Sequence, residues 1–300
     1  MALAARFDRF GPASVISVVE VEPPHPGPGE VRVRVRAVGL NPVDYKMREG
    51  TSRHSVRLPS GIGRELAGTV DELGDGVTTL RVGDEVFGTL HIGALADYAV
   101  VPAGNLARKP AELDWIVAGS LALAGQTAFD SFASQAVTSA DTVLVSAAAG
   151  GVGSIVAQLG RSSRATVLGT AGRSNQAYLA SLGVIPVLYG PGLADRVRVA
   201  APTGVSVVFD HHGAETIETA LELGVDRSRI NTIATDPGPF GIRRVGRGAP
   251  SIRTLDTLAE MVVRGELTIS IDAAYPLSEV VAAFERLERG HLRGKVVVVL

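Results

Sequence analysis

The chain has 300 residues, with 29 lysines and arginines against 31 acidic residues, so its net charge is −2. This balance gives no overall attraction to nucleic acid or to an anionic membrane surface. A hydrophobic content of 46% with 20% charged residues is typical of globular proteins, and the absence of cysteine excludes disulfides, iron–sulfur clusters and cysteine-ligated zinc.

The length is sufficient for one large domain or two ordinary ones, each with its own core. No apolar run reaches the roughly 18–20 residues that span a bilayer. The N-terminus carries Arg6, Asp8 and Arg9 early and lacks a long apolar segment, so it does not read as a signal peptide. We therefore expect a cytoplasmic protein without membrane partners.

The first part of the chain, residues 1–118, is rich in predicted strands. Residues 31–38 alternate valine or alanine with arginine, which is typical of a half-buried strand with a solvated arginine face. A proline-rich connector precedes this strand at 22–30, and prolines there block strand pairing. Short strands separated by glycine turns indicate a partly open β-barrel. The other strands expected in it lie at 66–73, 83–88 and 96–101.

From Trp115 onward, apolar runs alternate with segments of helical pattern, which is typical of a doubly wound parallel sheet. The five expected strands are 143–145, 166–168, 186–188, 205–209 and 229–234, and the crossover helices are near 151–162, 173–182, 192–200 and 214–223. Residues 236–250 form the main irregular segment and are expected to border the active cleft. A helix at 251–264 is followed by a strand at 269–274, a helix at 277–288 and a last strand at 295–300. We expect this last strand to return to the first domain.

Residues 141–153 carry the most informative pattern, DTVLVSAAAGGVG. A buried strand runs into small residues and glycines and then into a helix, which is the phosphate-binding corner of a dinucleotide fold. The first glycine of the usual fingerprint is replaced by alanine, and a plain glycine-rich turn is the alternative interpretation.

The second strand of this unit indicates which dinucleotide is bound. An NAD site usually places an acid at its end to hold the ribose 2′-hydroxyl, but residues 142–194 contain no Asp or Glu. Arg173 and Ser174 follow the strand instead, and a guanidinium suits a 2′-phosphate. We therefore expect NADPH; the alternative for Arg173 is an ordinary surface arginine.

Several motifs occur in an order that is specific when taken together. They are VGLNPVDYK at 38–46, GRELAG at 63–68, VGDEV at 82–86, LAGQTA at 123–128, the AAAGGVG turn and RGKVVVV at 293–299. Over nearly the whole chain they resemble the medium-chain dehydrogenase/reductase superfamily and, within it, its zinc-free quinone oxidoreductase (zeta-crystallin-like) branch. The resemblance implies a GroES-like barrel domain, residues 1–118 completed by 266–300, and a Rossmann NADPH-binding domain at 119–265.

The resemblance also implies that no zinc is bound. Zinc-dependent members carry a cysteine and a histidine where this chain has Asn41 and Arg64, and a catalytic zinc needs three protein ligands. We expect Arg64 to pair with Glu65 or Asp44; the alternative is a fixed charge that replaces the zinc ligand. His211 and His212 are adjacent, so we expect them to point to opposite faces, one toward the cofactor cleft and one toward water.

Residue roles follow from the same resemblance. Asn41 and Tyr45 are expected to be catalytic, with hydrogen bonds to a substrate carbonyl; Tyr45 is also a possible proton donor, its pKa lowered if Lys46 is close. The expected cofactor-binding residues are Thr127, Gly150, Gly151, Val152, Gly153, Gly169, Thr170, Arg173, Ser174, Tyr189, Asp210, His211, Ala234 and Lys295. For Tyr189 an ordinary half-buried strand tyrosine is the alternative.

The expected chemistry is hydride transfer from NADPH to an electron-poor acceptor, which needs positioning and a modest hydrogen bond rather than a metal. The leading hypothesis is a quinone reductase. The alternatives are an enoyl or enone reductase and a non-catalytic NADPH-binding protein. The resemblance suggests a homodimer, and we expect the apolar strands 205–209 and 229–234 to offer its edge.

Overall fold

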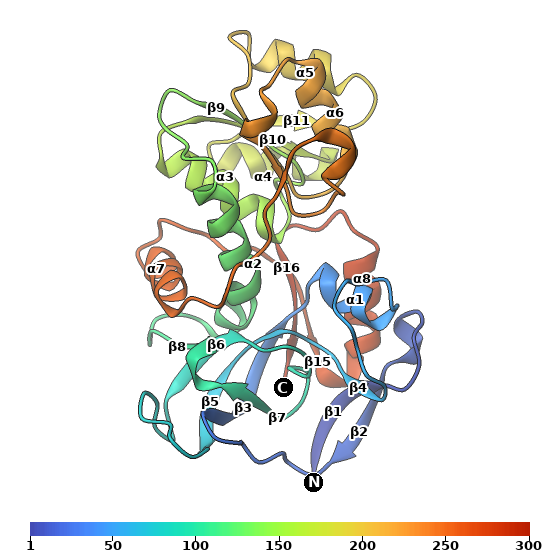
Figure 1. Ribbon diagram of the computed structural model, residues 1–300, viewed down its shortest axis with the longest axis vertical. Coiled ribbons are helices and arrows are strands. Elements are labelled where there is room, and N and C mark those ends of the chain that lie inside the picture. Colours follow the sequence, from blue (N-terminus) through green and yellow to red (C-terminus); the bar gives the residue numbers. More distant parts are fainter.

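The computed structural model describes residues 1–300 and consists of two lobes stacked along the long axis (Figure 1). The long helix α2 (Trp115–Ala133) runs from the lower lobe into the upper one. It begins at Asp114, whose carboxylate accepts hydrogen bonds from the first free N–H groups of the helix. None of the helices combines the length and the apolar character that a membrane span requires.

Two sheets form the lower lobe. The smaller has the order β2-β1-β4, and the larger has seven strands in the order β15-β16-β3-β5-β6-β8, with β7 also paired to β3. Their bounds are β1 Ala2–Phe7, β2 Ser17–Val21, β3 Glu30–Gly39, β4 Ser60–Gly61, β5 Glu65–Leu73, β6 Glu85–Thr89, β7 Tyr98–Pro102, β8 Leu106–Arg108, β15 Ile271–Pro276 and β16 Lys295–Val299. Because β16 pairs with β3, the C-terminal strand returns to the first part of the chain, as predicted.

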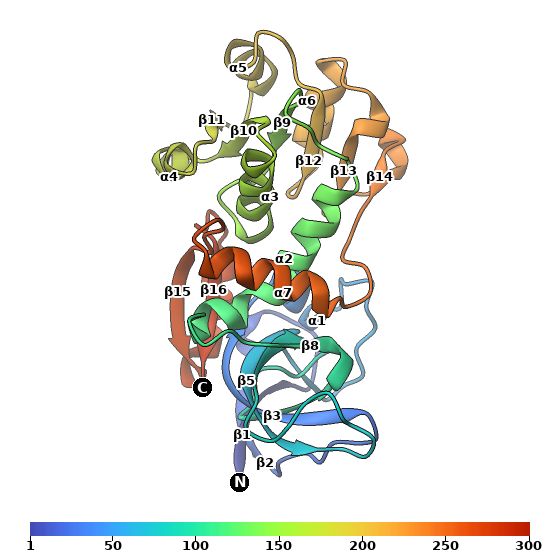
Figure 2. The ribbon, with the colours of Figure 1, turned by 90° about the vertical axis from the view of Figure 1, so that its left-hand side faces the viewer.

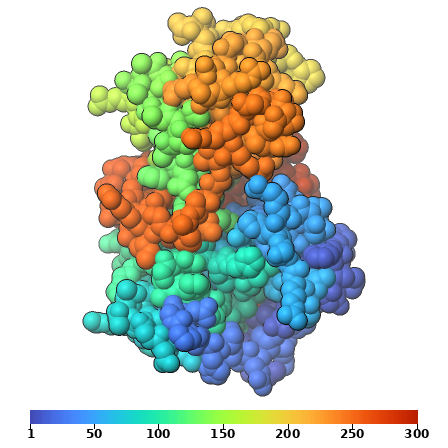
Figure 3. All heavy atoms as spheres, viewed as in Figure 1, coloured from blue at the N-terminus to red at the C-terminus, as the bar shows by residue number.

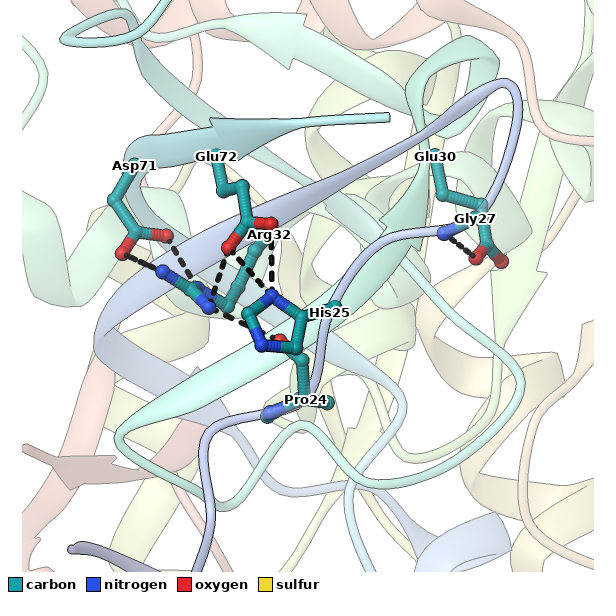
Figure 4. Close-up of polar contacts among 7 residues, drawn as sticks. All are labelled: Pro24, His25, Gly27, Glu30, Arg32, Asp71 and Glu72. Carbon is teal, nitrogen blue, oxygen red and sulfur yellow. Dashed lines mark hydrogen bonds and ion pairs between the residues drawn. The ribbon is translucent and has the colours of Figure 1, made fainter. Parts of the chain in front are cut away.

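The alternation of β3 is confirmed. Val31, Val33 and Val35 are buried, and the arginines lie on the other face. Arg32 forms ion pairs with two acids of β5: its Nη2 lies 2.9 Å from Asp71 Oδ2, and its Nη1 lies 2.5 Å from Glu72 Oε2 (Figure 4). These pairs neutralise Arg32 on the outer face of the strand.

The upper lobe contains a six-stranded parallel sheet of order β11-β10-β9-β12-β13-β14. This is the doubly wound order 3-2-1-4-5-6 of dinucleotide-binding folds. The bounds are β9 Thr142–Val145, β10 Thr166–Ala171, β11 Ile185–Leu188, β12 Val207–Asp210, β13 Ile230–Thr232 and β14 Arg243–Arg244. The sixth strand, β14, lies in the segment 236–250, which we expected to be irregular.

The predicted dimer edge is wrong as stated. β12 lies between β9 and β13, and β13 lies between β12 and β14, so neither strand is at an edge of the sheet. The short β14 covers that side and carries Arg243 and Arg244. The sequence pattern did not predict β14, because two residues are too few to show the alternation of a strand.

Helices cover both faces of the parallel sheet: α3 Gly151–Ser162, α4 Gln176–Ser181, α5 Leu193–Ala200 and α6 Ala214–Glu222. α7 (Ile252–Val263) packs beside α2 at the junction between the lobes (Figure 2). In the lower lobe, α8 (Val280–Glu288) packs against the short helix α1 (Pro42–Arg48). The helix α1 was not predicted from the sequence. Pro42 occupies the start of α1, where a missing N–H is harmless.

Candidate functional site

The glycine turn follows β9 at the point where the strand order of the sheet reverses, which is where doubly wound folds bind ligands. Gly150 precedes α3, and no acid lies in the first turn of this helix, so its positive end is free to attract an anion. A Cβ at Gly153 would collide with the carbonyl oxygen of Ala147, which itself has a φ of 46°. The backbone is therefore closely folded here, and glycine is required for that packing.

Asp210, at the end of β12, forms hydrogen bonds with residues at the ends of the neighbouring strands β9 and β13. Its Oδ1 accepts from Ser146 Oγ at 3.0 Å, and its Oδ2 accepts from Thr232 Oγ1 at 2.6 Å and Thr235 Oγ1 at 2.7 Å. The backbone N–H groups of residues 212 and 213 also donate to Oδ1. Both oxygens are occupied by the protein, so Asp210 fixes the positions of these strand ends, and its expected contact with a cofactor stays a prediction.

His211 is the next residue, and both of its ring nitrogens are inaccessible and without a hydrogen-bond partner. Burial lowers the pKa of His211 to about 4, although Asp210 and the bond at Ser146 oppose the shift. The ring is therefore neutral near pH 7 and stacks on Phe209 with centroids 6.3 Å apart. His212 is exposed, which agrees with the predicted contact with water, whereas the predicted position of His211 at the cofactor cleft stays a prediction.

The residues expected around the 2′-phosphate come from two neighbouring strand ends. Arg173 and Ser174 are exposed directly after β10, and Tyr189 is exposed after β11. The Tyr189 hydroxyl lies 3.4 Å from the position of a Cβ at Gly172, so the two strand ends meet. Tyr189 also forms a hydrogen bond of 3.0 Å with His291 Nδ1 and stacks on its ring. No sequence signal pointed to His291, because it lies far along the chain.

Other predicted cofactor residues have contacts within the protein. Gly169 is buried, and a Cβ there would lie 2.6 Å from that of Ala148. The Thr170 carbonyl accepts from the Ala148 N–H at 3.0 Å, and the Thr127 hydroxyl donates to the Leu123 carbonyl at 2.7 Å. The remaining two are half-buried: Val152 packs on the core beneath α3, and the N–H of Ala234 donates to Thr232 Oγ1.

A second cluster of polar side chains lies at the top of the lower lobe. Glu65, at the start of β5, is fully buried, and its Oε1 accepts from Lys295 Nζ at 2.7 Å and from Asn41 Nδ2 at 2.7 Å. Lys295 Nζ also donates to Asn41 Oδ1 at 2.5 Å. Oε2 of Glu65 accepts from the N–H of Leu123 in α2 at 2.7 Å. The cluster therefore joins β5, β16, α1 and α2.

Asn41 differs from its expected role in one respect. Its amide hydrogens are already bonded, to Glu65 and to the carbonyl of Gly39 at 3.2 Å. Lys295 makes two bonds here and has a third N–H, since an ammonium group carries three donors. Lys295, and not Asn41, therefore has the free donor in this cluster.

The same lysine connects the cluster to the glycine turn. A Cβ at Gly151 would lie 2.8 Å from Lys295 Cδ, so the lysine stem packs on this glycine. Gly294 donates its N–H to the carbonyl of Ala149 at 2.7 Å. The turn and the candidate catalytic cluster are thus parts of one site, formed where the two lobes meet.

Asp44 is buried below Asn41. Its Oδ2 accepts the Asn41 N–H at 2.8 Å, whereas Oδ1 has no partner. Burial raises the pKa of Asp44 from 3.8 to about 7, although the charges of Lys295 and Arg64 oppose the rise. Near neutral pH this carboxyl group therefore exists in both protonation states.

Tyr45 is half-buried and forms no hydrogen bond with the Asn41 cluster. Its pKa is raised, first by burial and then by the charges of Glu49 and Glu288. The idea that Lys46 lowers this pKa is therefore wrong: Lys46 is exposed and the shift has the opposite sign.

The predicted pairing of Arg64 is also wrong. Glu65 is paired with Lys295, and Arg64 forms no ion pair; its Nε donates to the carbonyl of His91 at 2.9 Å. The physical reason is that neighbouring residues at a strand start point to opposite faces.

Comparison with known proteins identifies the family. Residues 27–111 match the alcohol dehydrogenase GroES-like domain, and residues 182–298 match the zinc-binding dehydrogenase family. A quinone oxidoreductase of Salmonella typhimurium is 31% identical over 80% of this chain and 75% of its own length. The chain belongs to the quinone oxidoreductase family of the medium-chain dehydrogenases/reductases. Its members are oxidoreductases.

Two further relatives are similar over most of the chain. The quinone oxidoreductase from Coxiella burnetii has a TM-score of 0.90 at 30% identity, with 100% of both chains covered. The NADPH-dependent alkenal/one oxidoreductase of Arabidopsis thaliana chloroplasts is 31% identical over 87% of this chain and 70% of its own length. The family is therefore shown by sequence and by fold.

One of the matched family descriptions implies zinc, and the residues here do not fit a catalytic zinc site. No group of three or more His, Cys, Asp or Glu is arranged to hold a metal ion. The Lys295 ammonium lies within hydrogen-bond distance of both Asn41 and Glu65, so a protein cation already serves the oxygens that a metal would need.

Proposed function

We propose that this protein is an NADPH-dependent quinone oxidoreductase. The observation that carries the proposal is the contact of Lys295 with Gly151, which joins a phosphate-binding turn to the Asn41–Glu65–Lys295 cluster. The acid-free end of β10, with Arg173 and Ser174 exposed, supports a 2′-phosphate and hence NADPH. When bound, NADPH supplies the hydride.

The reaction needs one hydride and one proton for each quinone, which becomes a hydroquinone. We infer that the third N–H of Lys295 donates to the anionic oxygen that forms on the acceptor, and burial of the ammonium group supports this because it strengthens such a bond. Asn41 and Glu65 hold the ammonium group, and Asp44 holds Asn41. Tyr45 remains a proposed proton donor, and its raised pKa keeps it protonated at neutral pH.

A second candidate function is reduction of an α,β-unsaturated carbonyl. The Arabidopsis relative named as an alkenal/one oxidoreductase favours it. Hydride addition to the β-carbon of an enone leaves an enolate oxygen that needs the same N–H donor. The two activities therefore differ in the acceptor and not in the residues that stabilise charge.

The proposal includes zinc independence, a homodimer, a cytoplasmic location and the division into a catalytic domain (1–118 with 266–300) and an NADPH-binding domain (119–265). Zinc independence is supported by the lysine that binds Asn41 and Glu65. The domain division is supported by the pairing of β16 with β3. The dimer is supported by the family resemblance alone.

The test is NADPH oxidation in chelator-treated buffer, with a quinone and an enone offered side by side and NADH as the control cofactor. We expect turnover of the quinone with NADPH well above NADH, and no effect of the chelator. Tight NADPH binding without turnover of either acceptor would favour the non-catalytic alternative. Loss of activity on chelation would contradict zinc independence.

A further inference from the structure

Two arginines that the proposed mechanism does not use lie beside the Asn41 cluster. Arg64 directly precedes β5, and Arg247 comes from the segment between β14 and α7. Arg64 Nε donates to the His91 carbonyl at 2.9 Å, and Arg247 Nη1 donates to Thr89 Oγ1 at 2.6 Å. Two residues of extended chain span about 7 Å, so both guanidinium groups are anchored close together at the end of β6.

Neither arginine has an acidic partner. Arg64 is only 7% exposed, yet it forms no ion pair, and Arg247 forms none either. An arginine as buried as Arg64 is nearly always paired. Both pKa values are lowered, for Arg64 by burial and for Arg247 first by burial and then by the charge of Arg64. The two groups therefore repel each other in a poorly solvated place.

The carboxylates nearby form no ion pair with either arginine. Glu65 is bound to Lys295 and to Asn41, and Asp130 accepts the N–H of Gly248 at 2.8 Å. Asp44 carries only part of its charge near neutral pH, because its pKa is about 7. After the Glu65–Lys295 pair is subtracted, Arg247 has only the more distant charge of Asp130 and Arg64 only the partial charge of Asp44, so neither guanidinium group has a carboxylate within ion-pair distance.

The donors of both groups remain available. The terminal nitrogens of Arg64 make no hydrogen bond, and they are absent from the inaccessible unpartnered atoms, which belong to Asp44 and His211. Nε and Nη2 of Arg247 are likewise unbonded. A planar guanidinium fork with free donors matches the geometry of a carboxylate, sulfonate or phosphate group.

Two histidines lie near the arginines. His54 and His91 lie edge to face with ring centroids 6.5 Å apart, and the pKa of His54 is lowered by burial and then by the charge of Arg64. On the face shown in Figure 3, the orange surface of the 236–250 segment lies above the light-blue surface of α1 and the loop that follows it. Arg64 directly precedes Glu65 in the chain, and the charge of Glu65 acts on Arg247, so both arginines lie beside the Asn41–Glu65–Lys295 cluster.

We propose that Arg64 and Arg247 form an anion-binding subsite that selects acceptors carrying a carboxylate or a similar anionic group. The proposal rests on the reductase function, because it names the class of acceptor for that same site. The phosphates of NADPH have their own binding elements at the glycine turn and at Arg173. The substrate class is therefore an anionic quinone or enone, with the anion bound at a distance from the carbon that is reduced.

The test uses naphthoquinone and naphthoquinone sulfonate as acceptors with the full-length protein and NADPH. In Arg247→Gln and Arg64→Gln we expect kcat/KM for the sulfonate to fall about 10- to 100-fold more than for the neutral quinone, which is the range for hydrogen bonds to a charged group. Arg247→Lys should restore part of the preference. Arg198→Gln, which removes an exposed arginine of α5, should leave the ratio unchanged.

A binding measurement separates failure of the anion-binding subsite from failure of the proposed reductase function. Naphthalene sulfonate, which is not reducible, is titrated calorimetrically into the protein saturated with NADP⁺, after circular dichroism has shown that each variant is folded. Binding that both arginine variants weaken supports the subsite even if no acceptor turns over, and the proposed function alone then fails. Turnover of the neutral quinone without sulfonate preference or binding overturns the subsite. A weakened NADPH affinity in the variants assigns the arginines to the cofactor and also overturns it.

Discussion

Lys295 Nζ lies 2.7 Å from Glu65 Oε1, with side chains that are 4% and 0% exposed. The pair connects strands that are 230 residues apart in sequence and lies under the glycine turn through the contact of Lys295 with Gly151. A buried ion pair gains little over an apolar pair, but breaking it leaves an uncompensated charge in the interior. The relationship therefore makes the stability of the fold depend on the same residues as the proposed chemistry.

Lys295→Met should lower the free energy of unfolding by about 3–5 kcal/mol, because Glu65 is then buried without its cation. Glu65→Gln together with Lys295→Met should recover much of this loss. Urea unfolding of the two single variants and the double variant measures the coupling. Losses that simply add in the double variant would contradict a direct interaction between the two groups.

Asp44 gives the stability a specific pH dependence. Its pKa is raised from 3.8 to about 7, so between these values the folded state binds more protons than the unfolded state. The free energy of unfolding should therefore fall as pH rises from about 4 to 7, by an amount set by this shift. Asp44→Asn should remove this slope and still accept the Asn41 N–H. A slope identical in wild type and variant, measured by unfolding at several pH values, would show that Asp44 titrates normally.

Arg173 should determine the choice between the two cofactors. Arg173→Ala removes the guanidinium proposed to bind the 2′-phosphate, so Kd for NADPH should rise about 10- to 100-fold while Kd for NADH stays nearly constant. Fluorescence titration with each cofactor measures both constants, with Arg198→Ala as the control for loss of an exposed arginine. Equal weakening of NADPH and NADH would remove Arg173 from the 2′-phosphate site.

Gly153→Ala tests the close folding of the turn. Alanine normally stabilises a helix relative to glycine, but here its methyl group would meet the carbonyl oxygen of Ala147. We expect a loss of about 1–3 kcal/mol in stability and NADPH binding weakened by at least about tenfold. Gly104→Ala is the matched control, because nothing lies within 4 Å of its added Cβ. Wild-type NADPH affinity in Gly153→Ala would show that the turn does not contact the cofactor.

The first five strands of the parallel sheet, its crossover helices and the strands β3, β5, β6 and β7 were predictable because each apolar run is long enough to show a pattern. The elements not predicted include β4, β8, β14 and α1, since two to seven residues give too little pattern. β1, β2 and the long helix α2 were also not assigned from the sequence. The Asn41–Glu65–Lys295 cluster was only partly predictable: the resemblance pointed to Asn41 and Lys295, but no local signal joins Glu65 to a residue at the far end of the chain. The assumption that sequence neighbours pair also failed, because Arg64 and Glu65 lie on different sides of the chain.

The most direct test of the central claim is an anaerobic single turnover with equal amounts of NADPH-loaded enzyme and a quinone, followed by quantification of NADP⁺ and hydroquinone. We predict one hydroquinone for each NADPH oxidised, and a rate reduced when the transferred hydrogen of NADPH is replaced by deuterium. NADPH that stays bound and unoxidised in the presence of quinone would contradict the account.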